Sequence, residues 1–364
     1  MADCGDDKRD ASSAGKTRRR PKIPLPVEQP QPLPIPIAND QPLTEKTTIR
    51  LSGEDVEVHV NDLEVIDKLG QGQYGVVEKV RHKNTNCLFA LKRVRHSFDT
   101  KENERHIREI NVQQRTTNCP YAVFFYGALF REGDLMILME LMDLSLDRMY
   151  KTAHLADVNK PIPGNVLKHV AYSVLSALDY MYQIKIIHRD VKPSNILTNR
   201  RGQFKMCDFG IAGQLVNSFA RSEIGSQQYL APERIDVKRD GSRGYTSVSD
   251  VWSFGITMVE LANGKYPYEH WKTPFQQIND ILNGPTPKLR DDDPRFDPEL
   301  RDFVGKCLVK NPSERWRFNQ LLKHSFLSGC DRPETLESMQ EETAVFVKLI
   351  LDVMEAKKAQ QYSG

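Results

Sequence analysis

The chain has 364 residues, of which 39% are hydrophobic and 27% are charged, a composition typical of globular proteins. Its formal net charge is only +2, so the overall charge predicts no nucleic-acid partner and no attachment to a membrane surface. This length suits one large bilobal domain with tails, or two domains.

The cysteine content predicts a reducing compartment, the cytosol or the nucleus. The six cysteines are sparse, and none are paired at metal-ligand spacing. Residues 1–10 are polar and charged and lack the apolar core of a signal peptide. No run of about 18 apolar residues occurs, so no membrane span is expected.

Residues 1–55 are expected to form a disordered tail. Eight prolines fall between Pro21 and Pro42, and prolines at this density prevent a helix or a central strand. The stretch Pro21 to Pro24 also fits a P-x-x-P ligand motif.

From about Asp62 the sequence becomes typical of strands. Three apolar stretches with β-type residues follow, at 63–69, 77–80 and 87–94. Residues 103–115 instead repeat apolar side chains at helical spacing. These elements predict a small, mostly antiparallel sheet with one helix.

After about Asp143 the apolar spacing is helical. From Leu167 to Met181 the apolar side chains follow the i, i+3, i+4, i+7 pattern over four turns. Segments 249–263, 297–308 and 315–323 are also predicted to be helices. The sequence therefore predicts an α+β fold with a β-rich N-terminal half and a helical C-terminal half.

Three glycines, Gly70, Gly72 and Gly75, fit the pattern G-x-G-x-x-G-x-V. The spacing alone also occurs in dinucleotide-binding folds, where the glycines open a helix, and in plain glycine hairpins. Here β-type residues precede and follow the glycines. This favours a hairpin that folds over phosphates with its backbone N–H groups.

Lys92 ends the run Phe89-Ala90-Leu91-Lys92, which matches a strand motif that directs a lysine to the α and β phosphates of ATP. A lysine there needs a carboxylate to hold it, and Glu109, inside the predicted helix, is the candidate. For the lysine taken alone, a solvated strand end is the alternative.

The strongest signal is the run His188-Arg-Asp190-Val-Lys192-Pro-Ser-Asn195. Phosphoryl transfer needs positioning and charge neutralisation more than covalent help. Asp190 would accept and orient the proton of the acceptor hydroxyl, and Lys192 would stabilise charge at the γ-phosphate. Asn195 would hold one Mg²⁺.

The run Cys207-Asp208-Phe209-Gly210 supplies a further Mg²⁺ ligand, Asp208, and a phenylalanine that would pack as a conformational switch. The tripeptide Ala231-Pro232-Glu233 closes the segment. Together with the glycine loop and Lys92, these motifs predict transfer of the γ-phosphoryl group of ATP to a hydroxyl.

These residues resemble a eukaryotic protein kinase domain from residue 62 to 327, with an N-lobe of about 62–142 and a C-lobe of about 143–327. Asp250 and Arg315 fall where that family keeps a helix-anchoring aspartate and an arginine that pairs with the glutamate of Ala-Pro-Glu. The resemblance implies the bilobal kinase fold, with a small antiparallel sheet and one helix in the N-lobe and a larger helical C-lobe.

The same resemblance implies the nucleotide site. Met139 would guard the back of the pocket, residues 140–142 would be the hinge whose backbone bonds adenine, and Val77, Ala90 and Leu197 would enclose the ring. The residues expected to contact ATP are Leu69, Gly70, Gln71, Gly72, Gln73, Tyr74, Gly75, Val76, Val77, Ala90, Lys92, Met139, Glu140, Met142 and Leu197.

A closer resemblance is to the mitogen-activated protein (MAP) kinase kinases. It is carried by Met139 to Asp143, His188 to Leu197, Lys205 to Leu215 and Ala231 to Ile235. The stretches Thr273 to Gln277 and Phe346 to Ile350 are most similar to the stress-activated branch. That branch phosphorylates both the threonine and the tyrosine of a Thr-Gly-Tyr activation loop. The resemblance thus implies dual specificity, a downstream stress-activated MAP kinase and an upstream activating kinase.

Ser218 and Ser222 lie at the four-residue spacing at which this family is activated by phosphorylation. Two phosphates would add about −3 to −4 of charge and would order the loop on cations such as Arg189. Ordinary loop serines are the alternative. The run Gly225-Ser-Gln-Gln228 departs from the pattern of the branch in the substrate-facing loop.

The resemblance also implies docking segments at both ends. The N-terminal one would consist of a basic cluster and two apolar residues, Arg18, Arg19, Arg20, Ile23 and Leu25. A nuclear-import signal and a solvated charge run are the alternatives. Residues 331–364 would form a C-terminal tail whose amphipathic helix, 341–354, either docks an upstream kinase or packs back on the C-lobe.

The main hypothesis is therefore a dual-specificity kinase that acts between an upstream kinase and a stress-activated MAP kinase. One alternative is a kinase for the Thr-Pro-Tyr type of stress MAP kinase. The other is a pseudokinase scaffold that only binds. Loss of Lys92, Asp190, Asn195 or Asp208 would mark a scaffold, and all four are present.

Overall fold

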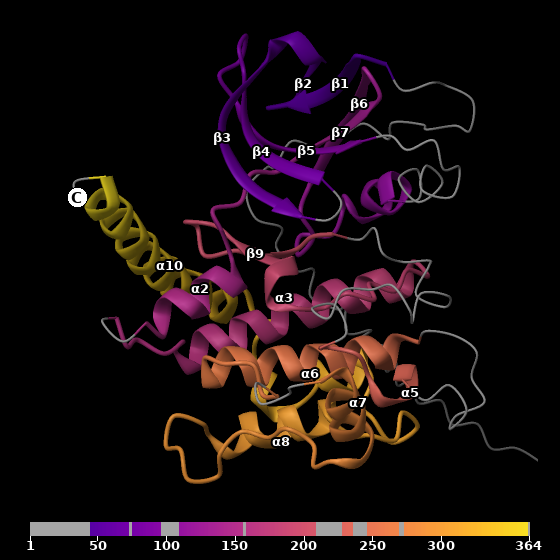
Figure 1. Ribbon diagram of the computed structural model, residues 1–364, viewed down its shortest axis with the longest axis vertical. Helices are drawn as coiled ribbons and strands as arrows, with labels where there is room; N and C mark the ends of the chain where they lie inside the picture. The colour runs from indigo at the N-terminus through magenta and orange to yellow at the C-terminus, as the bar shows by residue number, and fades with distance from the viewer. Residues whose placement is uncertain are drawn as a thin grey trace, which may run out of the picture.

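The computed structural model describes residues 44–72, 75–95, 109–155, 158–208, 228–235, 246–268 and 273–362 of the chain. A lobe of strands lies above a lobe of helices, and the chain crosses from one to the other after Met139 (Figure 1). The structure confirms the predicted α+β class and its division into a β-rich and a helical half.

The upper lobe is built on a five-stranded antiparallel sheet with the strand order β3-β4-β5-β7-β6. Its strands are β3 (Leu63–Gly72), β4 (Gly75–His82), β5 (Leu88–Arg95), β6 (Phe125–Arg131) and β7 (Asp134–Met139). Residues 109–116 are helical and pack on one face of the sheet, where Ile110 meets Phe125 and Ile137. They form the described end of the helix expected over 103–115.

Strands β6 and β7 escape detection in the sequence because residues 121–130 and 135–142 form two largely apolar runs, separated by the four residues from Arg131 to Asp134. Most of their side chains are buried on both faces, and such strands lose the alternation that marks a half-exposed strand. A two-residue turn joins them. Its residues, Glu132 and Gly133, have φ of 52° and 84°, as type I′ hairpins require.

A hairpin precedes the sheet and covers its other face. Strand β1 (Lys46–Leu51) pairs with β2 (Glu54–His59). Ile49 and Val58 are 2% and 0% exposed in one apolar cluster with Phe89 and other residues of the sheet. The tail expected over residues 1–55 therefore ends earlier, and residues 1–43 lie outside the described ranges.

The lower lobe is mostly helical. Its elements are β8 (Leu144–Ser145), α2 (Leu146–Ala153), α3 (Gly164–Gln183), β9 (Ile196–Thr198), β10 (Phe204–Met206), α5 (Pro232–Ile235), α6 (Ser247–Asn263), α7 (Pro274–Asn283), α8 (Pro298–Cys307), α9 (Phe318–Leu321) and α10 (Pro333–Tyr362). The helices expected over 249–263 and 297–308 are confirmed, whereas only the centre of 315–323 is α-helical. None of the helices within the described ranges is long and apolar enough to cross a membrane.

Helix α6 forms the centre of this lobe. Every residue from Ser249 to Ala262 is buried, so neighbouring elements surround the helix. Its C-terminus is closed by Gly264, whose φ of 72° allows its N–H to bond the carbonyl oxygen of Glu260. Polar side chains on a helix this deeply buried, such as Asp250, must form their hydrogen bonds within the protein.

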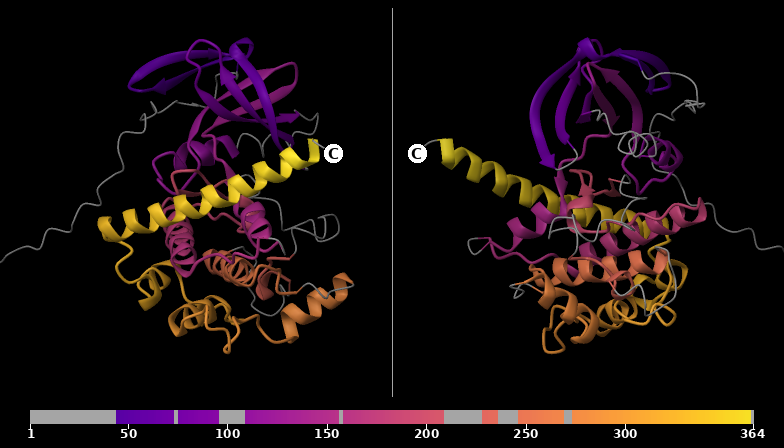
Figure 2. Two further views of the ribbon diagram at one scale, coloured as in Figure 1. Left: turned by 90° about the vertical axis from the view of Figure 1, so that its left-hand side faces the viewer. Right: turned by 45° about the vertical axis from the view of Figure 1, so that its right-hand side comes forward.

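Helix α10 runs along one side of the helical lobe (Figure 2). Phe346, Val347 and Ile350 are buried in the core of that lobe. At Gly202, a Cβ would lie 2.0 Å from the carbonyl oxygen of Gln340, so glycine lets the turn after β9 approach the helix. The helix is thus packed back on the lobe, and docking of an upstream kinase stays a prediction.

A core truncation tests the contribution of the hairpin. The Val58→Ala variant removes methyl groups from a side chain that is 0% exposed, so we expect it to lower the free energy of unfolding by about 1–3 kcal/mol. Val345→Ala removes the same atoms from a side chain that is 72% exposed, and it should change the free energy of unfolding by less than about 0.5 kcal/mol. Urea unfolding measures both, and equal losses would contradict the packing of the hairpin.

Candidate active site

Strands β3 and β4 end in the glycine hairpin. Gly72 pairs with Gly75, and Gly70 pairs with Val77, in antiparallel register. Gly75 has φ of 135°, and a Cβ there would lie 2.1 Å from the carbonyl oxygen of Arg93, so no larger residue fits without a shift. The glycines lie between two strands and do not open a helix, which removes the dinucleotide-fold alternative.

The sheet brings most of the residues expected around the nucleotide onto neighbouring strands. Val77 pairs with Lys92 across β4 and β5, and Ala90 pairs with Met139 across β5 and β7. Cross-strand partners lie on the same face of a sheet, as do residues two apart on one strand. Val77, Ala90, Lys92 and Met139 therefore share one face. Leu197 lies in the other lobe, on β9.

Lys92 holds two carboxylates, one from each lobe. Its Nζ is 2.5 Å from Oε1 of Glu109 and 2.6 Å from Oδ1 of Asp208. Lys92 and Glu109 are only 8% and 5% exposed. The Glu109 partner is the one expected from the sequence. Asp208, which follows β10 in the lower lobe, is a second partner that the motif spacing did not indicate.

The charges of Lys92 and Asp208 stabilise each other. Burial by itself would lower the pKa of Lys92, but the nearby charges of Asp208 and Glu109 raise it above its ordinary value. Burial would raise the pKa of Asp208, but the charge and hydrogen bond of Lys92 hold it below its ordinary value. Both side chains are therefore charged near neutral pH.

Asp190, Lys192 and Asn195 lie within hydrogen-bond distance of one another. The Nζ of Lys192 is 2.8 Å from Oδ2 of Asp190. The Nδ2 of Asn195 donates to the same oxygen at 2.8 Å and to the backbone carbonyl of Asp190 at 2.9 Å. A cation and an amide thus fix the Asp190 carboxylate in one orientation.

Asp250 on α6 holds the backbone of this loop. Its carboxylate accepts hydrogen bonds from the N–H groups of His188, at 3.0 Å, and Arg189, at 2.9 Å, and it is 1% exposed. Arg189 has φ of 69°, a conformation that costs energy in a residue other than glycine. The two charge-assisted bonds offset this cost and fix the position of Asp190, the next residue.

Asn195 and Asp208 offer oxygen ligands side by side. The N–H of Cys207 donates to the carbonyl oxygen of Asn195 at 3.0 Å, so Asp208 follows directly beside it. The amide nitrogen of Asn195 is used by Asp190, which leaves the amide oxygen, a ligand type that Mg²⁺ prefers. The described residues contain no group of three His, Cys, Asp or Glu side chains arranged for a metal. One carboxylate and one amide fit a divalent ion that is shared with phosphate oxygens.

The hinge after β7 is tied to the strand that leads to Asp208. The N–H of Glu140 donates to the carbonyl oxygen of Phe124 at 2.9 Å, and its carboxylate lies 2.6 Å from Nζ of Lys205 on β10. Lys205 is 2% exposed. Sequence reasoning missed this pair, although a lysine between Phe204 and Met206 in a short apolar strand signals a buried partner.

The Glu233 side chain anchors α5, which follows the segment that begins at Asp208. Arg315 donates to both of its oxygens, from Nη1 at 2.7 Å and from Nη2 at 2.9 Å. The two side chains are 0% and 7% exposed, and the guanidinium lies 5.2 Å from the ring centre of Trp252. The pairing implied by the family resemblance is present in the structure.

Several expected site residues lie outside the described ranges, and their positions stay predictions. They are the tip of the glycine hairpin, the residue after Asp208, the two serines and the N-terminal docking segment: Gln73, Tyr74, Phe209, Ser218, Ser222, Arg18, Arg19, Arg20, Ile23 and Leu25.

The family model of the protein kinase domain matches residues 63–327. The dual specificity mitogen-activated protein kinase kinase sek-1 of Caenorhabditis elegans is 40% identical over 348 residues, which are 93% of this chain and 98% of that protein. The chain belongs to the protein kinase family, among the MAP kinase kinases.

Two further relatives show the same membership. The MAP kinase kinase mkk-4 of Caenorhabditis elegans is 43% identical over 270 residues, 73% of each chain. Protein kinase wis1 of Schizosaccharomyces pombe is 42% identical over 282 residues, 76% of this chain but 45% of that protein. Enzymes of this family use ATP and a divalent metal, which suits the phosphate-directed lysine and the oxygen ligands described above.

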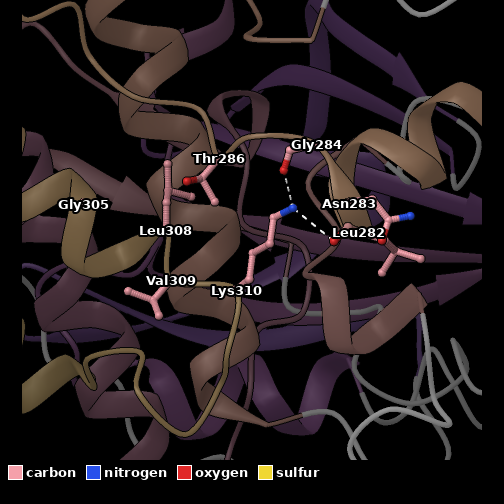
Figure 3. Close-up of a pocket in the computed structure, with 8 residues that line it drawn as sticks. All are labelled: Leu282, Asn283, Gly284, Thr286, Gly305, Leu308, Val309 and Lys310. Carbon is pink, nitrogen blue, oxygen red and sulfur yellow. Dashed lines mark hydrogen bonds between the residues drawn. The ribbon is translucent and has the colours of Figure 1, made fainter.

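A hollow of about 700 Å³ lies elsewhere on this kinase, in the helical lobe (Figure 3). It is lined by the ends of α7 and α8, and none of the expected site residues line it. At its centre the ammonium of Lys310 donates to the carbonyl oxygens of Leu282, at 3.1 Å, and Gly284. Lys310 thus closes the C-terminal end of α7, and the catalytic groups gather where the two lobes meet instead.

The buried pair in the kinase core gives a stability prediction. Glu233→Gln would leave the buried guanidinium of Arg315 without a counter-charge, so we expect a loss of about 3–5 kcal/mol in the free energy of unfolding. Asp291→Asn removes the same charge from a pair whose side chains are 73–75% exposed, and it should leave the urea midpoint unchanged. A Glu233→Gln variant as stable as the Asp291→Asn control would contradict this account.

Proposed function

We propose that this chain is an active dual-specificity kinase, which transfers the γ-phosphoryl group of ATP to the threonine and the tyrosine of a MAP kinase activation loop in a stress-signalling cascade. The observation that carries the proposal is the shared bonding of Lys92 to Glu109 and Asp208. Phosphoryl transfer requires a cation held at the phosphates, and carboxylates from both lobes hold this one.

The upper lobe supplies the nucleotide-binding groups in this proposal. Lys92 binds the α and β phosphates, and the backbone N–H groups of the glycine hairpin cover them. The face that carries Val77, Ala90 and Met139 encloses the adenine ring, and the hinge backbone at Glu140 and Met142 bonds its edge. Leu69 and Gln71 of β3 and Val76 of β4 belong to the two strands of that hairpin.

The lower lobe supplies the groups that act on the reacting atoms. Asp190 accepts the proton of the acceptor hydroxyl and orients its oxygen, and Lys192 neutralises charge on the transferred group. Asn195 and Asp208 would hold Mg²⁺, which when bound neutralises charge on the phosphate oxygens. Because Asn195 also bonds Asp190, one side chain fixes both the metal ligand set and the proton acceptor.

Regulation and partners follow from the family resemblance. Phosphorylation of Ser218 and Ser222 by an upstream kinase would add charge that orders the loop on cations such as Arg189. The basic cluster Arg18, Arg19 and Arg20, with Ile23 and Leu25, would steer and hold the MAP kinase substrate. The five described cysteines are free, which supports the proposed cytosolic or nuclear compartment.

The acceptor is tested by direct transfer. A Ser218→Asp, Ser222→Asp form should label both the threonine and the tyrosine of a kinase-dead Thr-Gly-Tyr MAP kinase, because the two carboxylates partly replace the phosphate charges. Phosphoamino-acid analysis after incubation with labelled ATP measures this. A Thr-Pro-Tyr MAP kinase, assayed in parallel, should react with kcat/KM at least about tenfold lower.

Two results would count against the proposal. Preference for the Thr-Pro-Tyr protein would favour the other stress pathway. No transfer to either protein, with ATP binding intact, would favour the scaffold.

The proton acceptor is tested by Asp190→Asn. The amide keeps an oxygen for the bond from Asn195 but cannot take a proton, so kcat should fall by about 10²–10⁴-fold while KM for ATP stays within about twofold. Steady-state kinetics on the MAP kinase acceptor measure both values. Asp292→Asn, which removes the same charge from an exposed loop, should leave kcat unchanged. A kcat near wild type for Asp190→Asn would rule out this role.

A further inference from the structure

One buried cation has no part in the chemistry above. Lys205 lies at the middle of β10 and is 2% exposed. Its Nζ is 2.6 Å from Oε2 of Glu140, whose side chain is 10% exposed. Apolar residues of similar volume are often as stabilising as a buried ion pair. The pair is therefore better explained by the elements that it joins than by its own energy.

The pair of Lys205 and Glu140 joins three segments of the chain. The Glu140 oxygen that meets Lys205 also accepts a hydrogen bond from the N–H of Phe124 at 3.2 Å. The N–H of Glu140 in turn donates to the carbonyl oxygen of Phe124 at 2.9 Å. Phe124 lies just before β6 of the upper lobe, Glu140 begins the hinge, and Lys205 belongs to the lower lobe. The start of the hinge is therefore fixed from both lobes at once.

The backbone of β10 is bonded on both of its sides. On one side Lys205 pairs with Leu197 of β9. On the other side Met206 bonds the segment that leads to β6: its N–H donates to Tyr121 at 2.8 Å, and its carbonyl oxygen accepts from Val123 at 2.9 Å. Because the strand is held on both sides, the ammonium of Lys205 cannot follow a moving hinge without breaking these bonds.

Lys205 lies between the two ends of the proposed nucleotide site. At one end, the hinge backbone that begins at Glu140 would bond the edge of adenine. At the other end, Asp208 follows Lys205 by three residues and lies 2.6 Å from Nζ of Lys92, where the phosphates and their metal ion would bind. The pair of Lys205 and Glu140 thus sets the position of the adenine end relative to the phosphate end.

We propose that Lys205 is a positioning residue for ATP, which acts through Glu140. By fixing the hinge relative to Asp208, it holds the two ends of the site at the separation that one ATP molecule spans. Lys205 itself contacts neither ATP nor the protein acceptor. This role rests on the proposed function, because it requires ATP to bind between the hinge and Asp208.

The role predicts a difference between a whole ligand and its two parts. A ligand that binds at two linked sites gains affinity only when the sites lie at the separation of its ends. Adenosine occupies the adenine end alone, and inorganic triphosphate with Mg²⁺ occupies the phosphate end alone. Without Lys205 each end keeps contacts of its own: Lys92 retains both carboxylates, and the N–H of Asp143 still bonds the carbonyl oxygen of Thr198. Only a ligand that spans both ends should therefore bind more weakly.

The test is the Lys205→Met variant of the full chain, with Kd measured by calorimetric titration. The whole ligand is an ATP analogue with an imido group between its β and γ phosphorus atoms, supplied with Mg²⁺, and its Kd should rise about tenfold. The Kd of adenosine and that of inorganic triphosphate with Mg²⁺ should each stay within about twofold. As a control, Lys288→Met removes the same ammonium from a pair whose side chains are 73–75% exposed, and it should leave all three Kd values unchanged.

A second variant covers the case in which Lys205→Met does not fold, since that change leaves the Glu140 carboxylate without its ammonium partner. The double variant Glu140→Gln, Lys205→Met removes both charges, and glutamine keeps an oxygen for the N–H of Phe124. The same selective loss of the ATP analogue is expected. Equal weakening of all three ligands would show that the pair only supports the fold and would overturn the proposal. An unchanged Kd for the ATP analogue would overturn it too.

The unchanged chain separates this proposal from the proposed function. If it binds the ATP analogue but phosphorylates neither MAP kinase, the proposed function alone fails, and the three Kd values still decide the role of Lys205. If it phosphorylates a MAP kinase but the three ligands weaken in parallel in the variant, the role of Lys205 alone fails. An unchanged chain that does not bind the analogue contradicts both.

Discussion

The ammonium group of Lys92 is the contact on which the active site depends. It is almost fully buried between Glu109 of the upper lobe and Asp208 of the lower lobe. A buried cation is stable only with its counter-charges in place, so the helix at Glu109 and the strand before Asp208 are held at fixed positions relative to β5. Movement of either lobe would leave one of these charges unpaired. The relative position of the lobes is therefore coupled to the charges that would meet the phosphates.

The lower lobe uses buried polar side chains in the same way. Apolar packing excludes water but does not fix the orientation of the groups it brings together. A carboxylate that accepts two hydrogen bonds fixes its own position and the positions of both donors. Asp250 fixes the catalytic loop, and Arg315 fixes Glu233 at the start of α5. Glu140 and Lys205 fix the hinge against β10. Apolar residues of similar volume often stabilise a core as well as such buried pairs do, so we infer that accurate placement is what these pairs contribute here.

Part of this arrangement could be predicted from the sequence. The catalytic residues of one loop are close in the chain, so local spacing alone brought Asp190, Lys192 and Asn195 together, and the strand-helix order suggested Glu109 for Lys92. The bond from Lys92 to Asp208 joins residues 116 apart, and no periodicity records such a contact. Strands β6 and β7 were hidden because burial on both faces removes alternation. Strands β1 and β2 were hidden by the proline-rich stretch before them, which made the whole N-terminus look like a tail.

The flanks of the kinase domain belong to the same folded body. The family model matches residues 63–327, yet Ile49 and Val58 complete the apolar cluster on the outer face of the upper sheet. At the other end Thr343 is 0% exposed and bonds the buried His169 of α3 at 2.9 Å, and Ile350 is also 0% exposed. A chain cut at the limits of the family match would expose both surfaces. Motifs thus mark where the chemistry lies, whereas burial marks the unit that folds, and here that unit reaches from β1 well into α10.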